Sequence, residues 1–212
     1  AVPDTPLTSR EARAAVARCI SLDDLRQLSS AHRVRDLVTF VALWGVGIAL
    51  TLGSFRLVPE AGALAWAGVA LGVVVSALAL NAFVLLLHEG MHGVLFHSPA
   101  LNRWVSVALG ATVLMSFSAY RTLHTIHHDE LGTDDDPDDY HAYTDKPAVF
   151  WALQYVRLTV GCILYLLAVP LTAFRRGSHE DRIGMAVEYP IIAALVALAV
   201  LTLPASAIVW GW

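Results

Sequence analysis

The sequence predicts an all-α fold: a polytopic bundle of membrane helices with a histidine-rich cap on its cytoplasmic side. Hydrophobic residues make up 57% of the 212 residues and charged residues only 15%, whereas about a quarter of an ordinary soluble domain is charged. Long apolar runs separate the polar segments, and one of them, residues 61–87, exceeds the roughly twenty residues that cross a bilayer. We therefore expect one membrane-embedded domain.

The N-terminal part is polar. Residues 1–36 are rich in arginine and carry apolar residues near helical spacing, which predicts an amphipathic cytoplasmic segment on the membrane surface. The membrane-embedded domain then occupies residues 37–212. Arg33 and Arg35 stand just before the first apolar run and favour a cytoplasmic N-terminus. The net charge of −4 and the lack of a basic stripe with interleaved aromatic residues give no reason to expect nucleic acid as a partner.

The first half of the domain predicts two spans and a hairpin. Residues 37–52 form the first span, and residues 61–87 form the second, which returns the chain to the cytoplasmic side. We expect residues 101–117 to double back as a shallow or re-entrant hairpin. A full crossing there would place the histidines before it and after it on opposite sides of the membrane.

The second half is less regular. Residues 149–174 are apolar and are followed by Arg175, Arg176 and Arg182. We expect an interfacial or re-entrant helix, which leaves these arginines inside; the alternative is a span that leaves them outside. Residues 191–203 predict a last span, and the segment after Pro204 predicts the first turns of a return helix.

Two histidine clusters end apolar segments. Residues 88–92 (H-E-G-M-H) place two histidines at i and i+4, and residues 124–128 (H-T-I-H-H) place three at i, i+3 and i+4, so each set shares one helix face. Five imidazoles suit Zn, Fe, Cu or Ni better than Mg or Ca. Ionisable groups at the ends of apolar helices indicate a functional site. The isolated histidines are expected to be surface or hydrogen-bonding residues: His32, His97, His141 and His179.

One interpretation of residues 88–92 is the H-E-x-x-H pattern of zinc proteases, with Glu89 as the general base. That pattern fixes only three positions. An intramembrane protease would also need an acidic ligand from a later span, and no later apolar run carries Asp or Glu near its middle. The other interpretation takes the clusters as H-x-x-x-H and H-x-x-H-H.

On the second interpretation, the chain from about Leu85 to Tyr189 resembles the membrane fatty acid desaturase family. The resemblance rests on residues 88–93 (H-E-G-M-H-G), 101–104 (L-N-R-W), 118–121 (S-A-Y-R), 124–128, 132–138 (G-T-D-D-D-P-D), 175–176 (R-R) and 188–189 (E-Y).

This resemblance implies a di-iron enzyme with its histidine boxes facing the cytoplasm, in an integral protein of a bacterial cytoplasmic membrane. Such an enzyme uses two irons, O2 and two electrons to insert a double bond into an acyl-lipid or acyl-thioester. The electrons come from a donor such as ferredoxin or a cytochrome b5-type protein. The positions that match the family's ligands are His88, His92, His124, His127 and His128, with no catalytic residue beyond them; Glu89, Asp129 and Glu130 are the candidates for orienting these imidazoles.

Several alternatives stay open. Related di-iron hydroxylases and carotenoid ketolases share these boxes. The family carries a third H-x-x-H-H box after its last span, and the 212 residues contain none, so we expect a chain that is C-terminally incomplete relative to the family; an inactive fragment is the corresponding alternative. We expect the acidic run at residues 134–139 to be a solvated loop. The arginines at 103, 121, 175 and 176 either dock an acidic electron donor or follow the positive-inside rule, which we favour.

Overall fold

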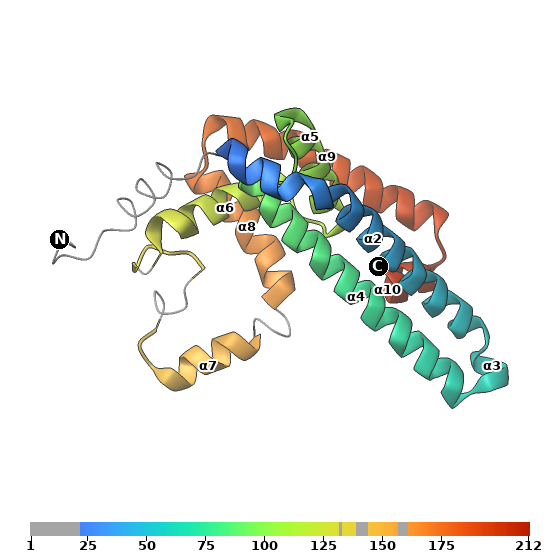
Figure 1. Ribbon diagram of the computed structural model, residues 1–212. Coiled ribbons are helices and arrows are strands. Elements are labelled where there is room, and N and C mark those ends of the chain that lie inside the picture. Colours follow the sequence, from blue (N-terminus) through green and yellow to red (C-terminus); the bar gives the residue numbers. More distant parts are fainter. Residues whose placement is uncertain (1–21, 132, 139–143, 157–160) are drawn as a thin grey trace, which may run out of the picture. The chain divides into compact units, whose positions relative to one another are not determined.

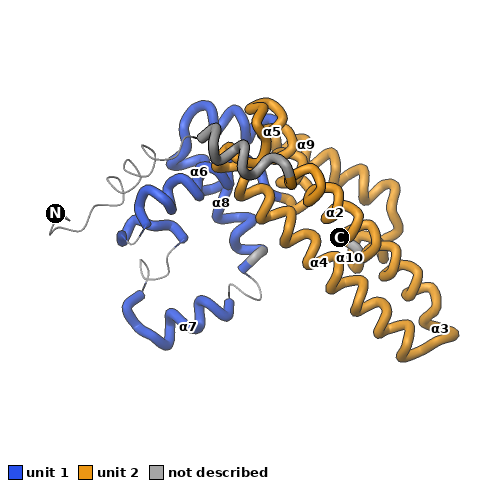
Figure 2. The backbone as a smooth tube through the Cα atoms, in the orientation of Figure 1, with its two compact units in different colours: residues 1–25, 115–187 blue, residues 26–114, 188–212 orange. Residues whose placement is uncertain are grey.

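The computed structural model describes residues 22–131, 133–138, 144–156 and 161–212 (Figure 1). All regular structure in these ranges is helical, which confirms the all-α prediction. The chain forms two compact units: residues 1–25 with 115–187 are unit 1, and residues 26–114 with 188–212 are unit 2 (Figure 2). The first 21 residues of the predicted amphipathic segment lie outside the described part of the chain.

Unit 2 contains the long helices. Three helices are long and apolar enough to cross a membrane by length and composition: His32–Arg56 within α2, α4 and α9. This agrees with the three predicted spans. The helices that lie wholly or largely in this unit are α2 (Leu22–Arg56), α3 (Val58–Ala61), α4 (Ala63–Met91), α5 (Pro99–Thr112), α9 (His179–Thr202) and α10 (Ala205–Gly211). The short α10 agrees with the predicted start of a return helix after Pro204.

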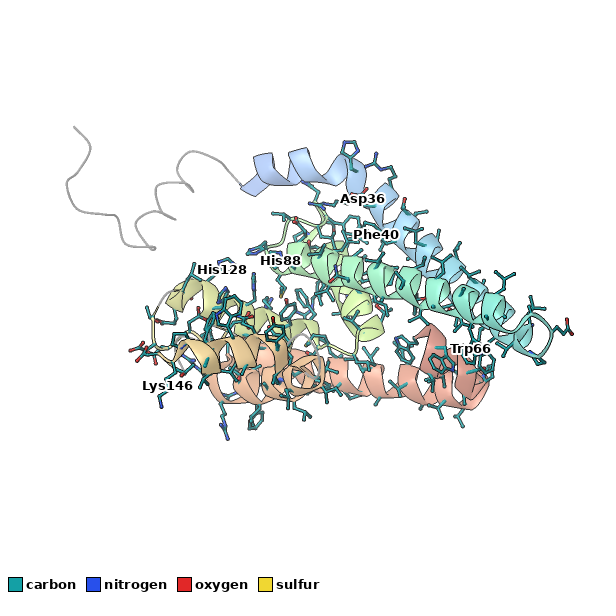
Figure 3. The ribbon with its side chains drawn as sticks, turned by 90° about the horizontal axis from the view of Figure 1, so that it is seen from below. Asp36, Phe40, Trp66, His88, His128 and Lys146 are labelled. Atoms are coloured by element: carbon teal, nitrogen blue, oxygen red, sulfur yellow. The ribbon has the colours of Figure 1, made fainter. Side chains whose placement is uncertain are left out.

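Helices α2 and α4 run side by side (Figure 1) and pack through small residues. A β-carbon at Gly47 would collide with Ser76, and one at Gly72 would collide with Thr51. Lipid tails are as apolar as leucine, so membrane helices associate where small residues let their backbones approach closely. Near the C-terminal end of α2, the ring of Phe55 meets that of Trp66 edge to face at a centroid distance of 6.1 Å (Trp66 is labelled in Figure 3).

Helix α2 is longer than the predicted first span. It continues without a break from Leu22 to Arg56, so residue 36, the expected end of the cytoplasmic segment, lies within a helix. Placing residues up to 36 on the membrane surface stays a prediction.

Helices α5 and α6 (Phe117–Glu130) have 14 residues each. At 1.5 Å per residue, each is about 21 Å long, less than the roughly 30 Å of a bilayer core. Between them Leu114 has a φ of 60°, which residues with a β-carbon rarely adopt. Ser116 then caps α6 by accepting a hydrogen bond from the Ala119 N–H at 3.1 Å. The two helices are therefore separated by a break, and the shallow or re-entrant hairpin expected at residues 101–117 stays a prediction.

Unit 1 is built around α6, and α8 (Cys162–Arg176) is its main partner. Buried residues on the two helices include Ala119, Leu123, Val169 and Ala173. Helix α7 (Pro147–Val156) has 10 residues and α8 has 15. Residues 157–160, between these helices, lie outside the described part of the chain, and the interfacial or re-entrant helix expected at residues 149–174 stays a prediction.

Candidate metal centre

The first histidine cluster, His88 and His92, lies at the C-terminal end of α4 (His88 is labelled in Figure 3). The two rings lie edge to face, with centroids 4.8 Å apart, as expected for i and i+4 on one helix face. The helix ends in a Schellman motif, in which the Gly93 N–H donates to the Gly90 carbonyl at 3.0 Å and the Val94 N–H donates to the Glu89 carbonyl at 3.1 Å. Gly93 has the left-handed φ of 71° that this motif requires. The backbone therefore fixes the end of the helix that presents both imidazoles.

The side chain of Asn102, in α5, forms hydrogen bonds with the end of α4 and with the residues that follow it. Its Nδ2 donates to the Gly90 carbonyl at 2.8 Å, and its Oδ1 accepts from the N–H groups of Leu95 and Phe96 at 3.0 and 3.2 Å. Gly90 also has no room for a side chain, because a β-carbon there would collide with Ser106. The sequence alone does not predict this role. Asn102 lies within a segment that resembles the family, and nothing in the local spacing indicates what its side chain contacts.

Glu89, a candidate for orienting the histidines, forms an ion pair with Arg33 of α2, with 2.8 Å between Oε2 and Nη2. The contact joins the N-terminal part of α2 to the end of α4. A general base must reach the proton that it removes, and here one oxygen of the Glu89 carboxylate is occupied by Arg33. This arrangement disfavours Glu89 as the general base of a zinc protease.

The second histidine cluster, His124, His127 and His128, occupies the last two turns of α6 (His128 is labelled in Figure 3). The Nε2 atoms of His124 and His128 lie 3.0 Å apart. Both imidazoles thus direct the same nitrogen toward one place, as a pair of metal ligands from one helix face would. The ring of His127 lies 6.3 Å from that of His124 and 5.7 Å from that of His128, between centroids.

His127 has a carboxylate partner that was not among the residues expected to orient the histidines. Its Nδ1 lies 2.8 and 3.0 Å from the two carboxylate oxygens of Asp136. Asp136 is only 1% exposed, so the expectation of a solvated acidic loop is wrong for this residue, although Asp134 and Asp135 are exposed as predicted. Asp136 is buried because its position in the loop faces His127 of α6.

The other two candidates for orienting the imidazoles lie next to the second cluster in sequence. Asp129 is exposed, and Glu130 is half-buried and accepts a hydrogen bond from the Thr133 hydroxyl at 3.3 Å. Their roles at a metal centre stay predictions. Among the isolated histidines, His32, His97 and His179 are exposed, and His141 lies outside the described residues.

Two of the four arginines considered for donor docking form ion pairs within their units. Arg121 pairs with Asp181 at 2.5 Å, and Arg103 lies 3.6 Å from the nearly buried Glu188. Arg175 and Arg176 are exposed at the end of α8.

The donor chemistry of both clusters fits a transition metal, because imidazole nitrogens suit Fe, Zn, Cu or Ni. The first cluster belongs to unit 2 and the second to unit 1. The structure brings together the histidines within each cluster, as their helical spacing predicts, and the meeting of the clusters at one centre stays a prediction.

The model of the family described as "Fatty acid desaturase" matches residues 64–212, which is more than two thirds of the chain and includes both histidine clusters. No curated protein and no solved structure matches the chain. The apolar helices and the family together indicate association with a membrane and an oxidoreductase activity. The chain belongs to the fatty acid desaturase family.

Proposed function

We propose that this protein is a di-iron desaturase that inserts a double bond into the acyl chain of a lipid or thioester. The observation that carries the proposal is the family match over residues 64–212, a range that contains all five histidines of the two clusters. The proposed iron ligands are His88, His92, His124, His127 and His128. Two irons held there would supply the O2-dependent removal of two hydrogens from an unactivated acyl methylene pair.

The proposed role of the protein is to hold the imidazole ligands in position. Each cluster lies at the end of a helix whose i and i+4 side chains share one face, so each helix offers two imidazoles in a fixed relation. Both helix ends are held by contacts within their own units: α4 by its Schellman motif and Asn102, and α6 by its packing on α8. The apolar helices would shelter the acyl chain from water.

A hydroxylase or carotenoid ketolase would use the same ligands, because the product depends on how the substrate lies relative to iron. Zinc proteolysis has less support. The family match favours oxygen chemistry, and Glu89, which would serve as the base, is ion-paired with Arg33.

The proposal extends to orientation and partners. Arg33 and Arg35 at the start of the first span support a cytoplasmic N-terminus, and the histidine clusters would then face the cytoplasm. Exposed Arg175 and Arg176 offer positive charge to an acidic electron donor such as ferredoxin or a cytochrome b5-type protein, since complementary charge speeds association. The bacterial cytoplasmic membrane named above stays a prediction.

The test is lipid and metal analysis of cells that express the protein. We expect about two irons per chain and new double bonds in the acyl chains. We expect His92→Ala and His127→Ala to lose both, whereas His179→Ala, a change at an exposed histidine, should keep both. New hydroxyl or keto groups would move the assignment to the hydroxylase or ketolase class, and one zinc per chain without lipid change would favour the protease. A protein with neither metal nor lipid products would overturn the proposal.

A further inference from the structure

The pairing of His127 with Asp136 has a consequence for the proposed metal centre. The side chain of Asp136 is fully buried, and that of His127 is 27% exposed. Both carboxylate oxygens lie within 3.0 Å of the same ring nitrogen, Nδ1. The opposite nitrogen of the ring, Nε2, therefore points away from the carboxylate.

An ionised carboxylate can only accept hydrogen bonds. The nitrogen of His127 that faces Asp136 must then carry the proton, and in a neutral imidazole the other nitrogen keeps its lone pair. We propose that Asp136 is a positioning residue, whose buried carboxylate holds the proton of His127 on Nδ1 and so leaves Nε2 as the nitrogen that binds metal. This inference rests on the proposed function, because it assumes that His127 is a ligand.

The neighbouring histidines support the choice of nitrogen. His124 and His128, on the same helix, face each other through their Nε2 atoms. If His127 also binds through Nε2, all three residues of the second cluster use the same nitrogen. Side chains on adjacent turns of one helix can then reach a common centre from a common side.

The loop that carries Asp136 is held in place from several directions. The Asp136 N–H donates to the Thr133 carbonyl at 3.2 Å, and Asp136 Oδ1 accepts from the Asp138 N–H at 2.9 Å. Arg176, at the end of α8, reaches the Asp135 carbonyl at 3.4 Å. These contacts join the loop to both α6 and α8 within unit 1. The carboxylate is therefore fixed in position before any metal binds.

The three carboxylates expected to orient the histidines are not buried as Asp136 is. Glu89 is engaged with Arg33, and Glu130 accepts from Thr133 in its own loop. Asp129 is exposed. Asp136 both contacts a histidine of the second cluster and is buried.

The first measurement is made on the metal-free wild-type protein in detergent. Nitrogen-15 chemical shifts of the histidine rings report which ring nitrogen carries a proton, and His127→Asn identifies the His127 signals by their loss. At pH 8.5 an ordinary imidazole, with a pKa near 6.5, is neutral. We expect a proton on Nδ1 of His127. A bare Nδ1 would overturn the proposal, and this result needs no variant of Asp136 to fold.

The second measurement is a titration with Co²⁺ alone. An outer partner of a metal-binding histidine typically contributes roughly 10–100-fold to metal affinity, so Asp136→Asn should weaken Co²⁺ binding by about that factor. Asp134→Asn, a change of the same kind at an exposed residue of the same run, should bind as wild type does. Thermal unfolding of both variants checks that they fold. A folded Asp136→Asn protein that binds Co²⁺ as tightly as wild type would contradict the inference.

The two proposals fail in different ways. A protein that makes no lipid product, but has Nδ1 of His127 protonated and loses Co²⁺ affinity in Asp136→Asn, would refute desaturation and support the positioning role. An active desaturase in which Nδ1 of His127 carries no proton would support desaturation and refute the positioning role of Asp136. A wild-type protein that binds no Co²⁺ would count against the metal centre, and the ring-nitrogen measurement would still decide the role of Asp136.

Discussion

Replacing Asn102 with alanine is expected to destabilise the helix end that presents the first histidine cluster. Asn102 is 6% exposed and makes three hydrogen bonds: one to the Gly90 carbonyl, and one each from the N–H groups of Leu95 and Phe96. Alanine removes all three. Leu95 and Phe96 are also buried, at 1% and 8% exposure, so water does not readily replace the lost partner.

The magnitude follows from the groups left without a partner. A buried donor that loses its acceptor costs about 1–3 kcal/mol, and Asn102→Ala leaves two such donors. The Gly90 carbonyl keeps the hydrogen bond from Gly93 at 3.0 Å and adds less. Allowing for relaxation, we expect a loss of roughly 3 kcal/mol in the free energy of unfolding. For a chain of this size, that lowers the melting temperature by roughly 6–12 °C.

The assay is thermal unfolding of detergent-solubilised protein, with wild type and variants heated at the same rate because membrane proteins often unfold irreversibly. Asn81→Ala is the control: the same change at an exposed position of α4, where we expect an effect within about 0.5 kcal/mol. A melting temperature within about 2 °C of wild type corresponds to a loss of less than about 1 kcal/mol. That result for Asn102→Ala would mean that the three hydrogen bonds do not hold this helix end.

Three further variants test other contacts by the same melting assay. Gly93→Ala should cost about 1–2 kcal/mol, because alanine is strained at a left-handed φ; an unchanged melting temperature would contradict the assigned helix end. Gly72→Leu should cost at least about 1–3 kcal/mol by overpacking the contact with α2, and a stable variant would mean that the helices do not pack there. Arg103→Ala should cost more than Arg33→Ala, because Glu188 is 2% exposed, whereas both members of the Arg33 pair are partly exposed and that change should cost under about 1 kcal/mol. Equal effects of the two arginine variants would show that burial does not set the strength of these pairs.

The parts of the fold that the sequence predicts are those that depend on local pattern. Apolar runs long enough to span a bilayer correspond to α2, α4 and α9. The i, i+3 and i+4 spacing of the histidines places each cluster on one helix, because helical periodicity is set by the backbone alone. These predictions need no knowledge of which helices are neighbours.

The missed features depend on contacts between distant residues. The acidic run offers several similar carboxylates, and nothing in their order indicates that Asp136 turns toward His127. The continuity of α2 was also missed, since a polar segment and an apolar run have different compositions yet no proline separates them between Leu22 and Arg56. Gly47 did not end the helix, as expected where close packing with α4 compensates for the low helix propensity of glycine.

The two histidine clusters are held by different means, and this difference predicts how they respond to mutation. The first cluster depends on backbone hydrogen bonds at the end of α4 and on Asn102, so damage there should lower the stability of unit 2 and disturb metal binding only as a consequence. The second depends on a side-chain contact, His127 with Asp136. Loss of that contact should change metal affinity by more than stability, because the imidazole remains but its protonated nitrogen is no longer fixed. Comparing unfolding with metal binding for Asn102→Ala and Asp136→Asn therefore separates a structural support from a positioning residue.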